Sequence, residues 1–205
     1  REHHLSVIED TAQAPLATYK GKYAGTIGDI GVFSLNYHKH IHTGEGGVAV
    51  TNNPDLAQRL QLIRNHAEVV VDGMGVTNLV NMLGWNYRMT ELQEALGFSQ
   101  LDRLDQFVDR RNALADRYDD ELAKLPLALP GRQAQTRSSF HLYIIRLLNP
   151  ASDQHRLVFQ RLRDEGIGVN IHYIPVHLQP YYRDLGFDVG DFPVAPAVVR
   201  FDPSQ

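Results

Sequence analysis

The chain of 205 residues contains no cysteine. It can therefore form neither a disulfide framework nor a zinc or iron–sulfur site with cysteine ligands. It also has no run of about 18 consecutive apolar residues, so we expect no transmembrane helix. Positive charge is not in excess, because the formal net charge is -4, and this disfavours nucleic-acid binding driven by bulk charge. We therefore expect a cytoplasmic protein that binds neither a membrane nor nucleic acid.

Both ends of the chain lack the features of a complete protein. The chain starts without an initiator methionine or an apolar signal-peptide segment, and it enters an apolar stretch within a few residues. The sequence of residues 200–205 predicts no closing secondary-structure element. The composition, with 43% hydrophobic and 21% charged residues, is that of an ordinary globular protein. We expect a fragment of a longer protein.

Short apolar segments in the first half predict an α/β sheet. Residues 5–10 predict a buried parallel strand that ends in two acids, Glu9 and Asp10. Residues 30–34 and 47–51 predict two further strands. Open α/β sheets bind ligands at the carboxyl ends of their strands, so we expect Asp10 to lie at a binding edge.

The other predicted elements are assigned from periodicity and from glycine and proline. Asn53 and Pro54 predict the start of a helix, and apolar spacing over residues 90–124 predicts two helices or one kinked helix. Elsewhere the sequence favours a helix over 11–17, a turn over 19–25, a loop over 65–84, strands over 140–146 and 167–172, and a helix over 152–165 that ends at Gly166. Residues 1–108 are thus predicted to belong to a large domain. Residues 109–205 are predicted to form a linker helix and a small α+β domain.

A lysine follows the second of the predicted strands. Lys39 lies in a polar loop, five residues after Ser34 and before the glycine-rich turn 44–47. A lysine amine forms imines when burial or a cationic neighbour lowers its pKa. On its own Lys39 is more readily explained as a surface charge. Its place between two strands, with a hydroxyl nearby to bind a phosphate, favours a Schiff-base lysine.

Asp10 offers the partner that this chemistry needs. A carboxylate at a strand end ordinarily caps the next turn, but it also serves as the counter-ion of a protonated pyridine ring. Gln13 follows one turn later, where its amide would reach a neighbouring ring substituent. The rival hypothesis is a metal site, because His38, His40 and His42 alternate and would share one face of an extended segment. Without a nearby carboxylate we expect no metal.

Several segments, in order along the chain, closely resemble the DegT/DnrJ/EryC1/StrS sugar aminotransferases. The segments that carry the resemblance are 7–14, 28–34 with Lys39 and 44–47, 64–66, 84–93 and 172–182. The resemblance implies a fold-type-I pyridoxal 5'-phosphate (PLP) enzyme that aminates a nucleotide-linked keto sugar, with glutamate as the amino donor. It also implies a homodimer with shared active sites.

The resemblance assigns roles residue by residue. Lys39 would form the imine with PLP and move the proton during transamination, and Asp10 would pair with the pyridinium nitrogen. Gln13 would lie by the ring hydroxyl, Ser34 would bind the phosphate, and Asn86 would reach the phosphate in the partner subunit. The loop that contains His172, Tyr173 and His177 would border the sugar-nucleotide pocket.

Two alternatives stay open. Some family members carry histidine in place of the lysine and act as dehydratases, but counting from Ser34 puts Lys39 in that position and the histidines outside it. The second alternative is a non-catalytic PLP-binding protein of the same fold. The resemblance further implies an N-terminal part and a C-terminal end that this sequence lacks, so we expect the isolated chain to be inactive.

Overall fold

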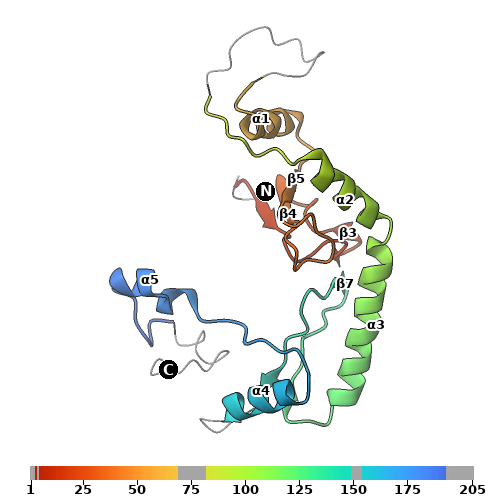
Figure 1. Cartoon of the computed structure of the whole chain (residues 1–205), viewed down its shortest axis with the longest axis vertical. Helices are drawn as coiled ribbons and strands as arrows, with labels where there is room; N and C mark the ends of the chain where they lie inside the picture. The colour runs from red at the N-terminus through yellow and green to blue at the C-terminus, as the bar shows by residue number, and fades with distance from the viewer. Residues whose placement is uncertain (1–2, 4, 69–81, 149–153, 193–205) are drawn as a thin grey trace. The chain divides into compact units, whose positions relative to one another are not determined.

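The computed structural model describes residues 3, 5–68, 82–148 and 154–192 (Figure 1). The chain forms two compact units. Unit 1 comprises Arg1–Tyr118 and Gly131–Tyr143, and unit 2 comprises Asp119–Pro130 and Ile144–Gln205. The predicted domain boundary between residues 108 and 109 stays a prediction. Among helices of the described residues, none has the length and apolarity needed to cross a membrane.

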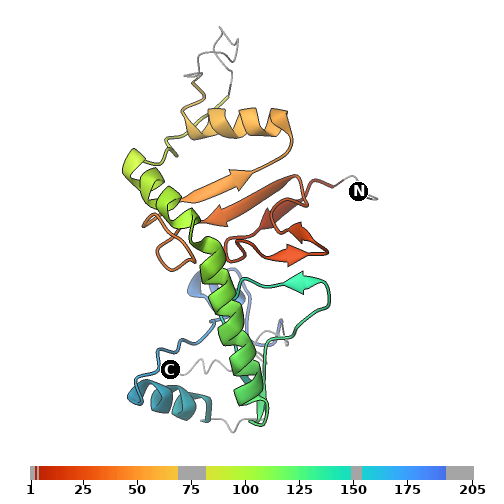
Figure 2. The ribbon, with the colours of Figure 1, turned by 90° about the vertical axis from the view of Figure 1, so that its right-hand side faces the viewer.

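A three-stranded mixed sheet forms the base of unit 1. Its strands are β1 (Ile8–Asp10), β4 (Ile30–Ser34) and β5 (Gly47–Val50), in the order β1-β4-β5 (Figure 2). β1 is parallel to β4, and β4 is antiparallel to β5. The three predicted strands are therefore confirmed, with β1 shorter than expected.

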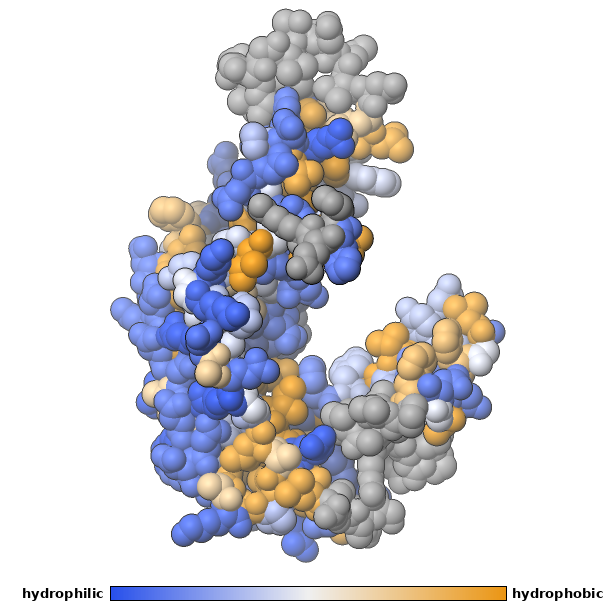
Figure 3. All heavy atoms as spheres, turned by 180° about the vertical axis from the view of Figure 1, so that it is seen from behind, coloured by the Kyte–Doolittle hydropathy of each residue, from blue (hydrophilic) through white to orange (hydrophobic). Residues whose placement is uncertain are grey.

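The predicted burial of the first strand is wrong for this chain. Leu5, Val7 and Ile8 are 74%, 50% and 67% exposed. β1 is the edge strand of the described sheet, and no described element covers its apolar side chains as a buried strand requires. Apolar side chains at the surface are also visible in Figure 3.

A small second sheet replaces the predicted helix and turn that follow β1. Residues 11–17 form successive turns, with hydrogen bonds from Ala14 N–H to Thr11 O and from Ala17 N–H to Ala14 O. β2 (Thr18–Tyr19) and β3 (Lys22–Tyr23) then form a hairpin, and β7 (Thr136–Arg137) pairs with β2. The two residues at the hairpin tip, Lys20 and Gly21, have φ of 50° and 75°, as a type I′ turn requires.

Two helices belong to unit 1, and a third begins in unit 1 and ends in unit 2. Asn53 caps α1 (Pro54–Arg64) as predicted, since its side chain accepts hydrogen bonds from the N–H groups of Asp55 and Leu56. The predicted long helical region is two helices, α2 (Glu91–Leu101) and α3 (Leu104–Leu122), and Thr90 and Gln93 form a capping box on α2. A core of Ile41, Leu104 and Val108 anchors the start of α3.

Besides the end of α3, the described residues of unit 2 form few regular elements. They are β6 (Leu127–Ala128), which pairs with β8 (Arg146–Leu147), then α4 (Gln154–Asp164), the 3-10 turn η1 (Val176–Leu178) and α5 (Pro180–Asp184). Gly166 follows α4 with φ of 78°, as the predicted helix end requires. The predicted strand over 140–146 is wrong except at its last residue, and residues 167–172 form no strand. Their apolar side chains have no sheet neighbour in the described residues.

Candidate functional site

Asp10 lies at the carboxyl end of β1, where the sheet topology places it beside β4. Its Cα partner across the parallel ladder is Val32, two residues before Ser34. Asp10 is exposed, and its Oδ1 accepts a hydrogen bond from the N–H of Ala12 at 3.1 Å. The other carboxylate oxygen has no partner among the described residues. The next residue, Thr11, fixes the end of β1 to β4, because it is buried and its hydroxyl donates a hydrogen bond to Val32 O at 2.8 Å.

Glu9 has a different function from its neighbour, which the sequence did not reveal. Its carboxylate accepts hydrogen bonds from three backbone N–H groups, those of Gly25 at 2.8 Å, Ile27 at 2.6 Å and Gly28. Partial burial raises the pKa of Glu9, but the three N–H groups outweigh it and hold the pKa below its ordinary value of 4.5. Glu9 therefore holds the 25–28 turn against β1.

The segment from Ser34 to Gly46 closes into a compact loop that presents Lys39. Its base is closed by two hydrogen bonds of 2.9 Å, from Leu35 N–H to Gly46 O and from Thr43 N–H to Leu35 O. Ser34 is half-buried at the end of β4, and its Oγ accepts the N–H of Asn36 at 3.3 Å. Lys39 is also half-buried, and its amine has no hydrogen-bond or ion-pair partner in the described part of the chain. The loop thus offers a free primary amine.

The three alternating histidines do not share a face. His38 is exposed beside Tyr37, with ring centroids 3.8 Å apart, whereas His40 is buried. The described residues contain no cluster of three or more histidines or acids that would hold a metal ion.

His40 instead links the lysine loop to residue 139. Its Nε2 lies 2.8 Å from the carbonyl oxygen of Ser139, so Nε2 carries the hydrogen, because a carbonyl oxygen only accepts. Burial lowers the pKa of His40 below its ordinary value of 6.5, and the nearby positive charges of Arg111 and Lys39 lower it further. The hydrogen bond to Ser139 raises the pKa, but by less than these effects lower it. His40 is therefore a neutral, structural side chain next to Lys39. Its place among other histidines in a loop expected to be polar gave no signal of this burial.

Gln13 lies in the turn that follows β1. Its side chain is exposed, and its backbone carbonyl accepts a long hydrogen bond of 3.5 Å from the hydroxyl of Ser139. Ser139 itself is 2% exposed. The same residue therefore contacts the Gln13 turn through its hydroxyl and the lysine loop through its carbonyl.

Asn86 lies on a segment that pairs with the end of α1. The two segments form an isolated antiparallel bridge between Asn65 and Asn86, with hydrogen bonds from Trp85 N–H to Ile63 O at 2.7 Å and from His66 N–H to Trp85 O at 2.9 Å. Asn86 is exposed, and its side-chain amide has no partner in the residues that the structure describes. It is fixed by its backbone and free at its side chain.

The residues predicted to border the substrate belong to unit 2. His172 and Tyr173 are exposed, whereas His177 is buried with its ring centroid 4.9 Å from that of Phe192. Asp10, Gln13, Ser34, Lys39 and Asn86 all belong to unit 1. The substrate role of the three unit 2 residues stays a prediction.

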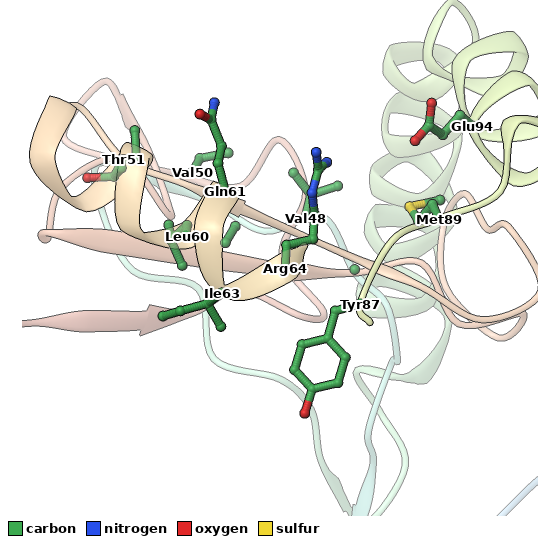
Figure 4. Close-up of a pocket in the computed structure, with 13 residues that line it drawn as sticks. Val48, Val50, Thr51, Leu60, Gln61, Ile63, Arg64, Tyr87, Met89 and Glu94 are labelled. Atoms are coloured by element: carbon green, nitrogen blue, oxygen red, sulfur yellow. The ribbon is translucent and has the colours of Figure 1, made fainter. Parts of the chain in front are cut away.

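A cavity of about 620 Å³ lies elsewhere in unit 1, between β5 and α1 (Figure 4). It is open to solvent, and its wall combines apolar side chains with the polar side chains of Gln61, Arg64 and Glu94. None of the predicted cofactor residues lines it. The candidate site is therefore the open carboxyl edge of β1 and β4, and not this cavity.

The side chains at this edge fit PLP by their chemistry. A carboxylate with one oxygen free suits a pyridinium N–H, a hydroxyl at a strand end suits a phosphate, and an amine without a partner suits an aldehyde. Asp10, Ser34 and Lys39 supply these groups in that order.

The chain is similar to known sugar aminotransferases in sequence and in structure. GDP-perosamine synthase from Caulobacter vibrioides is 36% identical over 197 residues, which cover 92% of this chain and 50% of that protein. The crystal structure of S. venezuelae DesV in complex with a ketimine intermediate matches with a TM-score of 0.85 and 33% identity, covering 97% of this chain and 52% of that one. The PLP-form of Spr1654, a putative sugar aminotransferase from Streptococcus pneumoniae, matches with a TM-score of 0.83 and 32% identity, covering 94% and 50%.

The chain thus spans about half the length of the relatives it matches. Its fold is that of the PLP-dependent transferases of fold type I, as predicted, over the part of that fold which this sequence covers. The family match itself extends over residues 1–200. The chain belongs to the DegT/DnrJ/EryC1/StrS aminotransferase family.

Proposed function

We propose that the protein containing this chain is a PLP-dependent transaminase that converts a nucleotide-linked keto sugar to an amino sugar, with glutamate as the amino donor. The observation that carries the proposal is that Asp10 and Ser34 end neighbouring parallel strands of one sheet, and that Lys39 lies in the loop that follows Ser34. The relative named GDP-perosamine synthase and the PLP- and PMP-forms of Spr1654 support the same activity and cofactor.

Each residue has a task that its position allows. PLP, when bound, supplies an aldehyde and a ring that accepts electrons. Asp10 would keep a proton on the ring nitrogen, Ser34 would bind the phosphate, and Gln13 would lie by the ring hydroxyl. The amine of Lys39 would bind the aldehyde and would then move a proton on the substrate side.

The second half of the site is assigned to other parts of the protein. Asn86 is exposed with a free side-chain amide, which suits a residue that reaches the cofactor phosphate of a partner subunit. A homodimer with shared sites would also cover the apolar side chains of α2, where Leu92 and Phe98 are 84% and 74% exposed. His172, Tyr173 and His177 would contact the sugar nucleotide. We place the protein in the cytoplasm, with no membrane or nucleic-acid partner.

The test uses the full-length protein with PLP and 3-keto and 4-keto sugar nucleotides. The expected result is a visible absorbance band of lysine-bound PLP and a glutamate-dependent amino sugar, both lost in Lys39→Ala. A sugar product without nitrogen would favour a dehydratase. Binding of PLP with no turnover of any keto sugar would favour a non-catalytic protein. If Lys39→Ala kept both the band and turnover, the proposal would be wrong.

A further inference from the structure

The loop that carries Lys39 is held by the inner face of α2. We propose that Gln100, on this helix, is a positioning residue that fixes the backbone of the loop and thereby the place of the Lys39 amine. The inference rests on the proposed function, because it assigns Gln100 a task in the reaction of Lys39.

Gln100 binds both backbone groups of one loop residue. Its side-chain nitrogen donates to the carbonyl of His42 at 2.6 Å, and its side-chain oxygen accepts the N–H of His42 at 3.2 Å. The nitrogen also donates to Leu96 O at 3.0 Å, one turn back on the helix. Gln100 is only 9% exposed. A buried amide that pairs with both the N–H and the C=O of one residue holds that residue as a neighbouring strand would.

Two other residues of α2 meet the same loop. Gln93 donates to Glu45 O at 3.0 Å, and a Cβ on Gly97 would lie 3.0 Å from the methyl carbon of Thr43. Positions 93, 97 and 100 follow the i, i+4, i+7 spacing of one helix face. The helix therefore approaches the loop closely, with glycine at the contact and an amide on either side of it.

The amphipathic pattern of α2 is inverted in this chain. Its inner face carries Gln93, Gly97 and Gln100, while Leu92, Leu96 and Leu101 are 84%, 44% and 50% exposed. A helix that merely covered a core would bury its leucines there. The inner face of α2 instead makes hydrogen bonds to the backbone of the loop that carries Lys39.

The hydrogen bonds of Gln100 restrain Lys39 because they hold His42, which is only three residues further along the chain. His40 and Ile41, between Lys39 and His42, are both buried, and His40 is bonded to Ser139. The amine of Lys39 has no partner among the described residues, so its position depends on the backbone that carries it. A displacement of about 1 Å in a reacting group costs on the order of 100-fold in rate.

The first experiment measures the loop without cofactor. We compare full-length wild-type protein with Gln100→Met, which keeps the length of the side chain, and with the matched control Gln106→Met on the exposed side of α3. Amide hydrogen exchange of the peptide covering residues 35–47 is followed in the apoprotein. Gln100→Met should raise exchange in this peptide roughly tenfold, since two neutral hydrogen bonds to His42 are lost. Gln106→Met should leave it unchanged.

The second experiment adds PLP and follows the visible band. Gln100→Met should slow its formation by about 10-fold or more and lower kcat, while KM for the sugar nucleotide stays within about twofold. Should Gln100→Met fail to fold, Gln93→Glu removes the amide that donates to Glu45 O but keeps an oxygen for the capping box with Thr90, and a smaller effect of the same kind is expected. Unchanged loop exchange, or faster exchange with unchanged band formation and kcat, overturns the inference. Absence of the band in the wild type would instead refute the proposed function.

Discussion

Replacing Glu9 by glutamine tests whether this acid is structural while its neighbour Asp10 is functional. In Glu9→Gln one side-chain oxygen remains to accept from Ile27 and Gly28, and an NH2 group faces the N–H of Gly25. Hydrogen bonds to a charged acceptor contribute about 1.5–3 kcal/mol each and those to a neutral acceptor about 0.5–1.5 kcal/mol. With the midpoints of these ranges, one bond lost and two weakened would total about 5 kcal/mol, which the exposure of the Glu9 carboxylate to water reduces to about 2 kcal/mol.

The assay is urea unfolding of the full-length protein at several pH values. Because the folded pKa of Glu9 is depressed, its stabilisation is fully present above the ordinary value of 4.5 and is lost as the pH falls below it. The difference between wild type and Glu9→Gln should therefore be largest near neutral pH and shrink in acid. Asp10→Asn is the control, because Asp10 accepts one hydrogen bond, from Ala12. A loss below about 0.5 kcal/mol at pH 7, or a loss that does not vary with pH, would refute the reasoning.

Three further predictions concern the same unit. The folded pKa of His40 lies below its ordinary 6.5, so its contribution to stability is complete above that value and is lost as the pH falls below it. His40→Gln should therefore make the free energy of unfolding depend less on pH between pH 7.5 and 5.5. An unaltered pH dependence would contradict this. A Cβ on Gly31 would lie 2.0 Å from Gly25 O, whereas one on Gly168 has open space, so Gly31→Ala should cost about 3 kcal/mol or more in denaturant unfolding and Gly168→Ala almost nothing. If two subunits share each site, mixing Lys39→Ala with Asn86→Ala subunits should give hybrids with one intact site and restore about a quarter of wild-type turnover; no recovery after subunit exchange would argue against a shared site.

The elements that were predicted correctly are those set by local sequence. β4 has the predicted bounds, α1 begins after its Asn53 cap, and α2 begins after the capping box at Thr90. The missed hairpin of β2 and β3 depends on positive φ at Lys20, a residue that gives no such signal. The two incorrect strands in the second half are apolar runs, and periodicity alone cannot supply the sheet partner that a strand needs.

The candidate site, too, could be predicted only where local sequence determines it. Asp10 and Ser34 could be placed at one edge because both end short strands of a predicted sheet, and Lys39 because it follows Ser34 in a glycine-bounded loop. The hydrogen bonds of Glu9, His40 and Gln100 could not be predicted, because each is made to a backbone group brought near by folding. Burial of β1 was predicted from composition, yet burial depends on what packs over the strand.

The central claim is that Lys39 binds PLP, and borohydride reduction of the full-length protein with PLP tests it most directly. Reduction makes the lysine–cofactor bond permanent, and peptide mass mapping then locates it. The account predicts the added mass of one reduced PLP on the peptide that contains Lys39, with none on Lys20, Lys22 or Lys124. A label on another lysine, or no label when the visible band is present, would contradict it.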